Sequence, residues 1–285
     1  MTEPATAHQI EHMTRKEADM AFKRRAWTLF EWLGDTDGKV ILDCGCGRGF
    51  YLKMLRHLSA TSRLLGIDLE FPLLVKARRN VGHLSGVLPA NASVYDLPYA
   101  GATFDAVILS EVLEHVERDV EALAEIRRVL KPGGVLLITV PHADFPFWWD
   151  PINKTLERFF HTHIGRGPLA GIWANHVRLY TPEQLRTAAL EAGFRVEAER
   201  SFTHHCFPFV HNILYGLGKP LIESGLLGDG LTNAADRGSF DRDGGSAWNP
   251  VNLGLRVLNR IDRKNRMSEP QGRSTVNLCL KARKP

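Results

Sequence analysis

Short apolar runs alternate with longer amphipathic segments over about residues 38–142. The short runs are typical of buried strands in a parallel sheet, and the longer segments are typical of helices that cover it. The expected strands lie at 40–44, 64–69, 103–110 and 135–140, with another before a turn at 96–99, and the expected helices lie at 50–58, from 71 onward and at 120–130. This alternation predicts an α/β fold.

The pattern resumes after a long interruption. Thr181, Pro182 and Gln184 have the order of a capping residue, a first-turn proline and a third-position glutamine, so they predict a helix that ends at Gly193. Residues 194–200 predict a sixth strand, and 275–280 alternate cleanly enough to predict a seventh.

The segment Val40–Gly49 joins a predicted strand to a predicted helix through glycines at alternate positions, Gly45, Gly47 and Gly49. Glycine allows a tight turn and the close approach of a ligand to the backbone. Asp43 stands two residues before the first glycine. A carboxylate there would repel a pyrophosphate but would suit a cationic ligand, which favours S-adenosylmethionine (SAM) over NAD. The alternative is an ordinary strand–turn–helix corner.

Asp68 ends the second predicted strand, 19 residues after Gly49. An acidic residue at this position of such folds holds a ribose diol, since a carboxylate can accept from both hydroxyl groups. The alternative is an N-cap for the helix that Phe71 and Pro72 open.

The motifs of the first half follow a recognisable order, from Leu42–Gly49 through Gly66–Asp68 and Leu97–Tyr99 to Glu111–Val116 and Val129–Gly134. This order resembles class I SAM-dependent methyltransferases, and most closely the group that contains the ubiquinone and menaquinone biosynthesis enzymes. The resemblance covers about residues 38–142 and, weakly, 174–200. It implies a Rossmann-like sheet of seven strands, mostly parallel with an antiparallel last strand, and SAM as cofactor.

The resemblance also implies which residues contact SAM. Asp43, Gly45, Cys46, Gly47 and Gly49 would surround its methionine part and ribose. Asp68 and Leu69 would hold the ribose and the adenine face, and Ser110 would close the site. Ser93 is the expected adenine contact, with Asn91 next.

Three segments lie outside this common core. Residues 1–34, with an amphipathic helix over Arg15–Trp32, predict a helical cap, and residues 35–285 form the methyltransferase domain. Insertions at about 142–180 and 204–273 follow the fifth and sixth strands, so they emerge over the cofactor and are expected to form a substrate lid. The second includes a predicted mobile loop, Gly228–Gly245.

Aromatic side chains gather in the first insertion, which suggests a large apolar or aromatic acceptor. They are Phe145, Phe147, Trp148, Trp149, Phe159, Phe160 and Trp173. The alternative is that they pack only the insertion's own small core.

Methyl transfer to oxygen or carbon needs a base, for which histidine is suited at neutral pH. The candidates are His115, His142 and His176, although a histidine in such a position is more often structural than catalytic.

A metal site is the alternative for some of the same side chains. Glu111, Glu114 and His115 would share one face of a helical turn. They resemble the metal-binding Glu-x-x-Glu-His of some ubiquinone O-methyltransferases and small-RNA 2′-O-methyltransferases, in which a distant histidine, here His176, completes the set. However, metal-independent members of the group also carry Glu-His-Val. We therefore favour a site without a divalent metal over a metal site.

Composition is consistent with a single elaborated domain: 285 residues, 44% hydrophobic, with no apolar run long enough to span a membrane. Residues 1–10 are polar and do not resemble a signal peptide, and four scattered cysteines fit a reducing cytoplasm.

The C-terminal segment is basic, because residues 256–285 contain nine Lys/Arg and only two Asp/Glu. This cluster predicts a solvated face or peripheral contact with an anionic membrane surface. Contact with RNA is the weaker prediction, because aromatic residues are not interleaved with the cations.

The sequence therefore predicts a cytoplasmic enzyme that methylates an oxygen, or less expectedly a carbon or nitrogen, of a hydrophobic small molecule such as a quinone precursor, polyketide or lipid. The alternatives are an RNA methyltransferase and a non-catalytic SAM-binding partner subunit.

Overall fold

The computed structural model describes residues 3–15, 17–209, 212–213 and 250–285. The loop predicted at Gly228–Gly245 lies outside these residues.

One seven-stranded sheet forms the centre of the protein, in the order β3-β2-β1-β4-β5-β7-β6. Strands β1 to β5 pair in parallel, whereas β7 runs antiparallel to both β5 and β6. This arrangement confirms the predicted fold class. The strands are β1 (Val40–Cys44), β2 (Arg63–Asp68), β3 (Val87–Asn91), β4 (Phe104–Ser110), β5 (Leu130–Pro141), β6 (Arg195–Phe202) and β7 (Asn277–Arg283).

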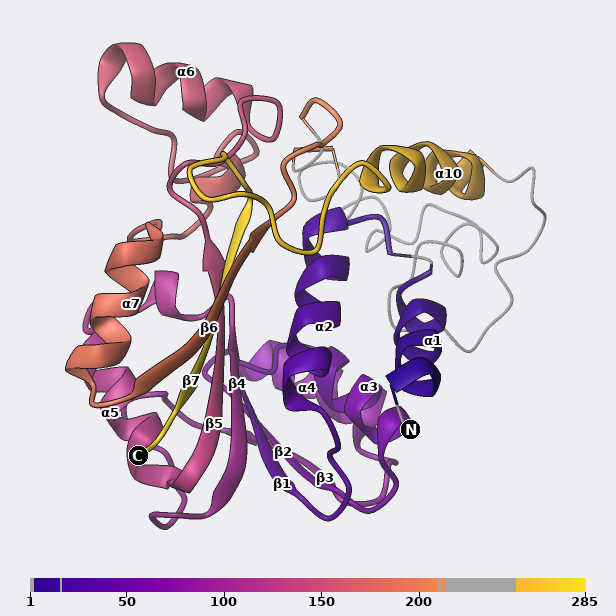
Figure 1. The fold of residues 1–285 in the computed structure, drawn as a ribbon, viewed down its shortest axis with the longest axis vertical. Coiled ribbons are helices and arrows are strands. Elements are labelled where there is room, and N and C mark those ends of the chain that lie inside the picture. Colours follow the sequence, from indigo (N-terminus) through magenta and orange to yellow (C-terminus); the bar gives the residue numbers. More distant parts are fainter. Residues whose placement is uncertain (1–2, 16, 210–211, 214–249) are drawn as a thin grey trace.

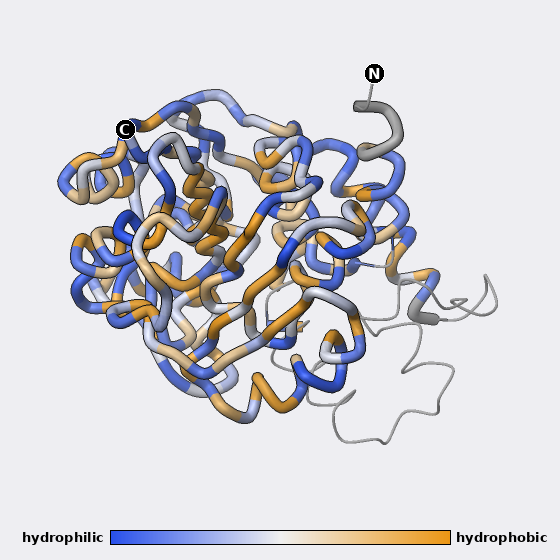
Figure 2. Tube along the Cα trace, turned by 90° about the horizontal axis from the view of Figure 1, so that it is seen from below, coloured by the Kyte–Doolittle hydropathy of each residue, from blue (hydrophilic) through white to orange (hydrophobic). Residues whose placement is uncertain are grey.

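Helices cover both faces of the sheet (Figure 1). The helices of one face are α1 (Glu3–Thr14), α2 (Met20–Leu33), α3 (Phe50–Leu58) and α4 (Phe71–Val81), and those of the other are α5 (Asp119–Val129) and α7 (Pro182–Glu191). Alternate residues of a strand point to opposite faces, so Ile41 packs with α2 and α3 while Leu42 packs with α5 and α7. Hydrophobic segments accordingly concentrate in the interior (Figure 2).

Two predicted boundaries were wrong. The helix expected from Arg15 begins only at Met20, because Asp19 accepts hydrogen bonds from the backbone N–H groups of Ala21 and Phe22 and so caps the helix there. Residues 131–134, expected as a turn before the fifth strand, lie within β5. They form an irregularity, since the pairing with β4 passes from Leu130 directly to Val135.

The insertions lie beyond the edge at which the parallel strands end (Figure 1). The first contains α6 (Pro151–Phe160) and a short 3-10 helix, η2 (Gly171–Trp173), and the second contains α10 (Pro250–Asp262). A buried ion pair of 2.9 Å between Arg24 Nε and Asp262 Oδ1 joins α10 to α2. Both insertions therefore stand over the carboxyl ends of the strands.

Candidate active site

The glycine loop after β1 has the left-handed backbone that its sequence predicts, with φ of 83° at Gly45, 53° at Gly47 and 78° at Gly49. The backbone N–H groups of Gly45 and Cys46 both donate to the Ile67 carbonyl, each at 2.8 Å, which ties the loop to β2. A Cβ at Gly45 would lie 2.2 Å from a methyl group of Val112. The loop therefore requires glycine both for its conformation and for its contact with the segment after β4.

Asp68, at the end of β2, is fastened to this loop. Its Oδ2 accepts from Gly47 N and its Oδ1 from Glu70 N, each at 2.8 Å. Glu70, not Asp68, is the N-cap residue of α4. Carboxylate oxygens keep further lone pairs for two ribose hydroxyl groups. The neighbouring Leu69 is 73% exposed, so an apolar surface for a flat ring lies next to the carboxylate.

The two candidates for the adenine contact lie on the far side of Asp68. Asn91 pairs with Asp68 across the sheet and donates from Nδ2 to the Asp68 carbonyl at 2.8 Å and the Leu69 carbonyl at 3.0 Å. Ser93 forms an isolated bridge with Asp96, and its hydroxyl accepts from Tyr95 N at 3.2 Å. Asn91 is therefore directly joined to the Asp68–Leu69 segment, and Ser93 follows it.

Asp43 lies beneath the loop and is 1% exposed. Its Oδ2 has no hydrogen-bond partner among the described residues. Burial, together with the nearby Asp68 charge, raises the pKa of Asp43 to about 8. A cationic ligand would stabilise the ionised carboxylate, so this orphaned oxygen fits the sulfonium and ammonium groups of SAM. Burial also raises the pKa values of the Cys44 and Cys46 thiols, so these cysteines are protonated small residues of the loop.

A chain of polar contacts runs from the loop side towards the next strands. The Ser110 hydroxyl, at the end of β4, lies 3.1 Å from Tyr51 OH and 2.7 Å from Thr139 Oγ1. Thr139 Oγ1 donates to Glu111 Oε1 at 2.9 Å, and Arg25 Nη1 donates to Glu111 Oε2 at 2.8 Å. Both oxygens of Glu111 are therefore engaged within the protein.

A cavity of about 200 Å³ opens beside this chain, at the carboxyl ends of β4 and β5. Its lining combines apolar side chains with buried ionisable ones. The lining residues are Asp19, Arg25, Glu111, Glu114, His115, Pro141, Trp149, Ile172, His176, Val276 and Asn277.

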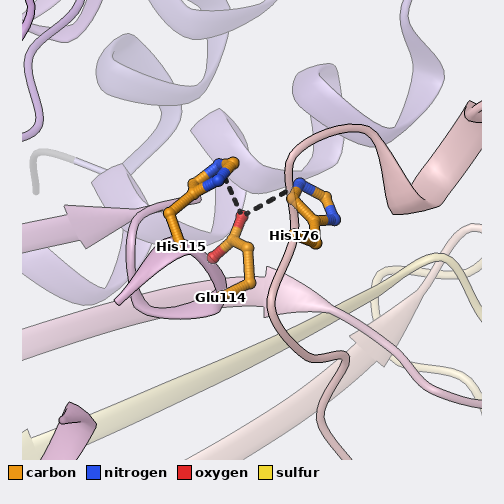
Figure 3. Close-up of side chains that lie close together, drawn as sticks. All are labelled: Glu114, His115 and His176. Atoms are coloured by element: carbon orange, nitrogen blue, oxygen red, sulfur yellow. Dashed lines mark ion pairs between the residues drawn. The ribbon is translucent and has the colours of Figure 1, made fainter. Parts of the chain in front are cut away.

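Glu114 is the most unusual of these residues, because it is fully buried and neither carboxylate oxygen has a hydrogen-bond partner among the described residues. Burial, and then the charge of Glu111, raise its pKa well above the ordinary value. The Nε2 atoms of His115 and His176 each lie 3.9 Å from Glu114 Oε1, one on either side (Figure 3). We call Glu114, His115 and His176 the carboxylate–imidazole cluster.

Of the predicted catalytic and metal residues, Glu111, Glu114, His115 and His176 line one cavity. The helical turn expected to carry Glu111 and His115 on one face was wrong, because only Leu113–His115 form a 3-10 turn and Glu111 precedes it with a left-handed φ of 56°. His142 does not line the cavity. It is buried nearby, with Nδ1 at 2.9 Å from Thr275 Oγ1, and burial lowers its pKa.

Trp149, one of the aromatic residues expected around the acceptor, lines the cavity. Sequence reasoning missed Arg25 and Asn277, because no local motif marks them and they reach the cavity from α2 and β7. The side-chain amide of Asn277, fully buried, has neither atom hydrogen-bonded within the described residues.

A larger cavity, of about 600 Å³, lies between the start of α5 and α7, with Asp119, Arg178 and Gln184 in its lining. None of the predicted site residues borders it, so it is separate from the edge where the motifs meet.

A family profile described as a methyltransferase domain matches residues 42–138. The ubiquinone/menaquinone biosynthesis C-methyltransferase UbiE of Haemophilus ducreyi is 34% identical over 187 residues, which cover 60% of this chain and 70% of that protein. The chain therefore belongs to the family of SAM-dependent methyltransferases, enzymes that use SAM as the methyl donor.

Other relatives match over a smaller share of their own length. A fatty-acid O-methyltransferase of Mycolicibacterium smegmatis is 33% identical, over 47% of this chain and 51% of that protein. An uncharacterised protein of a Streptomyces fradiae transposon is 28% identical, over 68% of this chain and 54% of its own. The chain thus spans about half the length of these two relatives.

Solved structures support the fold. Haemonchus contortus phosphoethanolamine N-methyltransferase 2, in complex with SAM, superposes with a TM-score of 0.52 at 17% identity, covering 92% of this chain and 52% of that one. A SAM-dependent methyltransferase of Mesorhizobium loti superposes with a TM-score of 0.50 at 18% identity, covering 91% of this chain and 97% of that one.

Proposed function

We propose that this protein transfers the methyl group of SAM to an oxygen of a hydrophobic small molecule bound in the cavity at the ends of β4 and β5. One observation carries the proposal: this cavity combines apolar walls, among them Trp149 and Ile172, with a buried Glu114 carboxylate that accepts no hydrogen bond from any described residue. Apolar walls with a few convergent polar groups are typical of small-molecule sites.

SAM would be held by Asp43, the glycine loop, Asp68 and Leu69, with Asn91 and Ser93 towards the adenine. It supplies a methyl group that is already activated. The protein then has to align the acceptor, exclude water and remove a hydroxyl proton. The carboxylate–imidazole cluster supports this last role, since its three side chains converge on the cavity, whereas the lining carboxylates Asp19 and Glu111 are engaged in hydrogen bonds within the protein. His142 is a weaker candidate, because it contacts Thr275 and does not line the cavity.

The lid is part of the same proposal. Asp19 and Arg25 come from residues 1–34, and Trp149, Ile172 and His176 come from the insertion at about 142–180. These contributions support a cap and an insertion that enclose the acceptor. We extend the proposal to the insertion at 204–273, whose α10 packs against α2.

The activities for which relatives are named support an apolar acceptor. They include the fatty-acid O-methyltransferase above and a 2-phytyl-1,4-naphtoquinone methyltransferase of Trichormus variabilis, 33% identical over 39% of this chain and 52% of that protein. A tRNA methyltransferase of Arabidopsis thaliana is 42% identical, but over only 38% of this chain and 25% of its own. A quinone precursor, polyketide or lipid is therefore favoured over RNA.

The test is methyl transfer from methyl-labelled SAM to three kinds of acceptor: prenylated phenols, long-chain fatty acids and bulk tRNA. We expect label in the organic extract, with a phenol or fatty acid as acceptor. Label in tRNA alone would overturn the small-molecule proposal. SAM binding without transfer to any acceptor would instead support a non-catalytic SAM-binding subunit.

We further infer that α10 brings the protein to an anionic membrane surface. Exposed cations lie on α10 and the turn after it, namely Arg256, Arg260, Arg263, Lys264 and Arg266. Leu253 and Val257 of the same helix are each 50% exposed, which supports peripheral contact. Across the described ranges, no helix is both long and apolar enough to pass through a membrane. The unpaired cysteines support a reducing cytoplasm as the compartment.

A further inference from the structure

We propose that Glu114, His115 and His176 bind a divalent transition-metal ion, with the open side of the ion facing the acceptor cavity. Binding of the ion stands on the geometry of these side chains alone, whereas its part in activating an acceptor rests on the proposed function.

The three side chains are already close to coordination distance. One oxygen of Glu114 and one nitrogen of each imidazole lie within 4.8 Å of one another, and Glu114 Oε1 is 3.9 Å from each Nε2 (Figure 3). Around a tetrahedral ion with bonds of about 2.1 Å, ligand atoms stand about 3.4 Å apart. The three-ligand set would therefore be complete after a contraction of roughly half an ångström along each Glu114–imidazole distance and an approach of the two imidazole nitrogens, now within 4.8 Å of each other, to the same spacing.

The hydrogen bond of His115 fixes the tautomer that a metal ligand needs. Its Nδ1 lies 3.0 Å from the Asn175 carbonyl oxygen, which can only accept, so Nδ1 carries the proton. In the neutral ring, Nε2 then presents a lone pair towards the Glu114 carboxylate. Two acceptors that face each other require a cation or a proton between them. Metal-binding histidines usually have this outer hydrogen bond.

The charge of the cavity lining also favours a cation. Three carboxylates, Asp19, Glu111 and Glu114, line it against one guanidinium, Arg25. Glu111 is engaged with Arg25 and Thr139, whereas the oxygens of Glu114 have no hydrogen-bond partner within the described part of the chain. A buried carboxylate without a partner is costly to ionise. A divalent ion beside Glu114 would stabilise the ionised form of this carboxylate.

The donor set indicates which ions fit and what they would do. Two imidazoles and one carboxylate suit Zn²⁺, Fe²⁺, Co²⁺ or Ni²⁺, and three protein ligands leave a position open. An acceptor hydroxyl in that position would lose its proton to solvent more readily. Its oxygen would then bond to the methyl carbon as the carbon–sulfur bond breaks, and the electron pair of that bond would pass to sulfur, leaving S-adenosylhomocysteine.

The experiment titrates Co²⁺ and Zn²⁺ into full-length, chelator-stripped protein without SAM or acceptor, using calorimetry and Co²⁺ absorption. We expect one saturable site per chain. Glu114→Gln and His176→Ala should each weaken it by at least the roughly 10- to 100-fold that loss of a ligand's outer hydrogen bond costs, since each variant removes a ligand itself. His57→Ala is the matched control, because His57 is an exposed histidine on α3, and it should bind as the wild type does.

Wild-type protein without a saturable site, or Glu114→Gln with wild-type affinity, would overturn the proposal. SAM binding by each variant shows that it is folded. Failure of the proposed function is a separate result: metal binding without methyl transfer leaves the site standing, and full methyl transfer after chelation removes the ion from the chemistry.

Discussion

At the scale of single residues, Asp43 connects the glycine motif to the charge of the methyl donor. Burial and the Asp68 charge raise its pKa to about 8 from an ordinary value of 3.8. Between these values the folded, ligand-free protein holds a proton that the unfolded chain does not. Its free energy of unfolding therefore falls as the pH rises through this window. A cationic ligand that requires the ionised form offsets this loss, so the carboxyl group is suited to a cation rather than to an empty pocket.

This linkage predicts how SAM affinity depends on pH. Binding should expel the Asp43 proton, so the affinity for SAM should rise between about pH 6 and 8, by up to roughly tenfold per pH unit, and level off above pH 8. Calorimetry at several pH values, in buffers of different ionisation heat, measures both the affinity and the released proton. Asp43→Asn is the control and should lose this part of the dependence. An identical pH profile in the wild type and Asp43→Asn would contradict the assignment.

At the scale of elements, the basic C-terminal segment divides into two parts. Four of its nine cations make contacts within the fold. Arg273 pairs with Glu269 at 3.0 Å and Arg283 with Glu197 at 2.5 Å, while Lys281 and Lys284 donate to backbone carbonyls. The other five are exposed on α10 and the turn that follows. The positive charge that is free to meet a partner is thus confined to these five cations on α10 and the following turn, beside the exposed Leu253 and Val257.

This narrower surface predicts selective binding to anionic vesicles. Wild-type protein should sediment with phosphatidylcholine–phosphatidylglycerol vesicles at low salt, and much less with phosphatidylcholine alone. Arg256→Gln/Arg260→Gln should weaken this binding roughly thirtyfold, since each cation contributes about 1 kcal/mol near such a surface. The matched control Arg78→Gln/Arg79→Gln removes the same charge from exposed positions on α4. Equal losses in both variants would indicate a general charge effect and contradict a role for α10.

At the scale of the whole molecule, the sheet and the SAM loop could be predicted because their signals are local. Runs of apolar residues define β1 and β4, and glycines at fixed spacing define the turn after β1. The start of α2 was missed because a single capping residue, Asp19, outweighs the amphipathic pattern that begins earlier. The acceptor cavity was only partly predictable. Arg25 and Asn277 reach it from α2 and β7, and only the folded chain brings such distant residues together.

The first insertion shows the same limit for aromatic side chains. Phe145 and Trp149 are buried in a small cluster with Met20 and Val276. Trp148 and Phe159, identical in type and close in sequence, are more than half exposed. Composition alone cannot separate the two groups, because the packing of α2 and of the residue before β7 against the insertion decides which ring is covered. Only Trp149 of the predicted aromatics lines the acceptor cavity.

The central claim is that one edge of the sheet holds two adjoining sites, a donor site at Asp68 and an acceptor site at Glu114. The most direct test measures SAM affinity and methyl transfer side by side in Asp68→Ala and Glu114→Gln. The acceptor is one that the wild type methylates among the prenylated phenols and long-chain fatty acids. Asp68→Ala should weaken SAM binding tenfold or more, since charge-assisted hydrogen bonds contribute about 1.5–3 kcal/mol. Glu114→Gln should bind SAM as the wild type does and transfer methyl groups far more slowly. Wild-type SAM affinity in Asp68→Ala, or wild-type transfer in Glu114→Gln, would contradict the account.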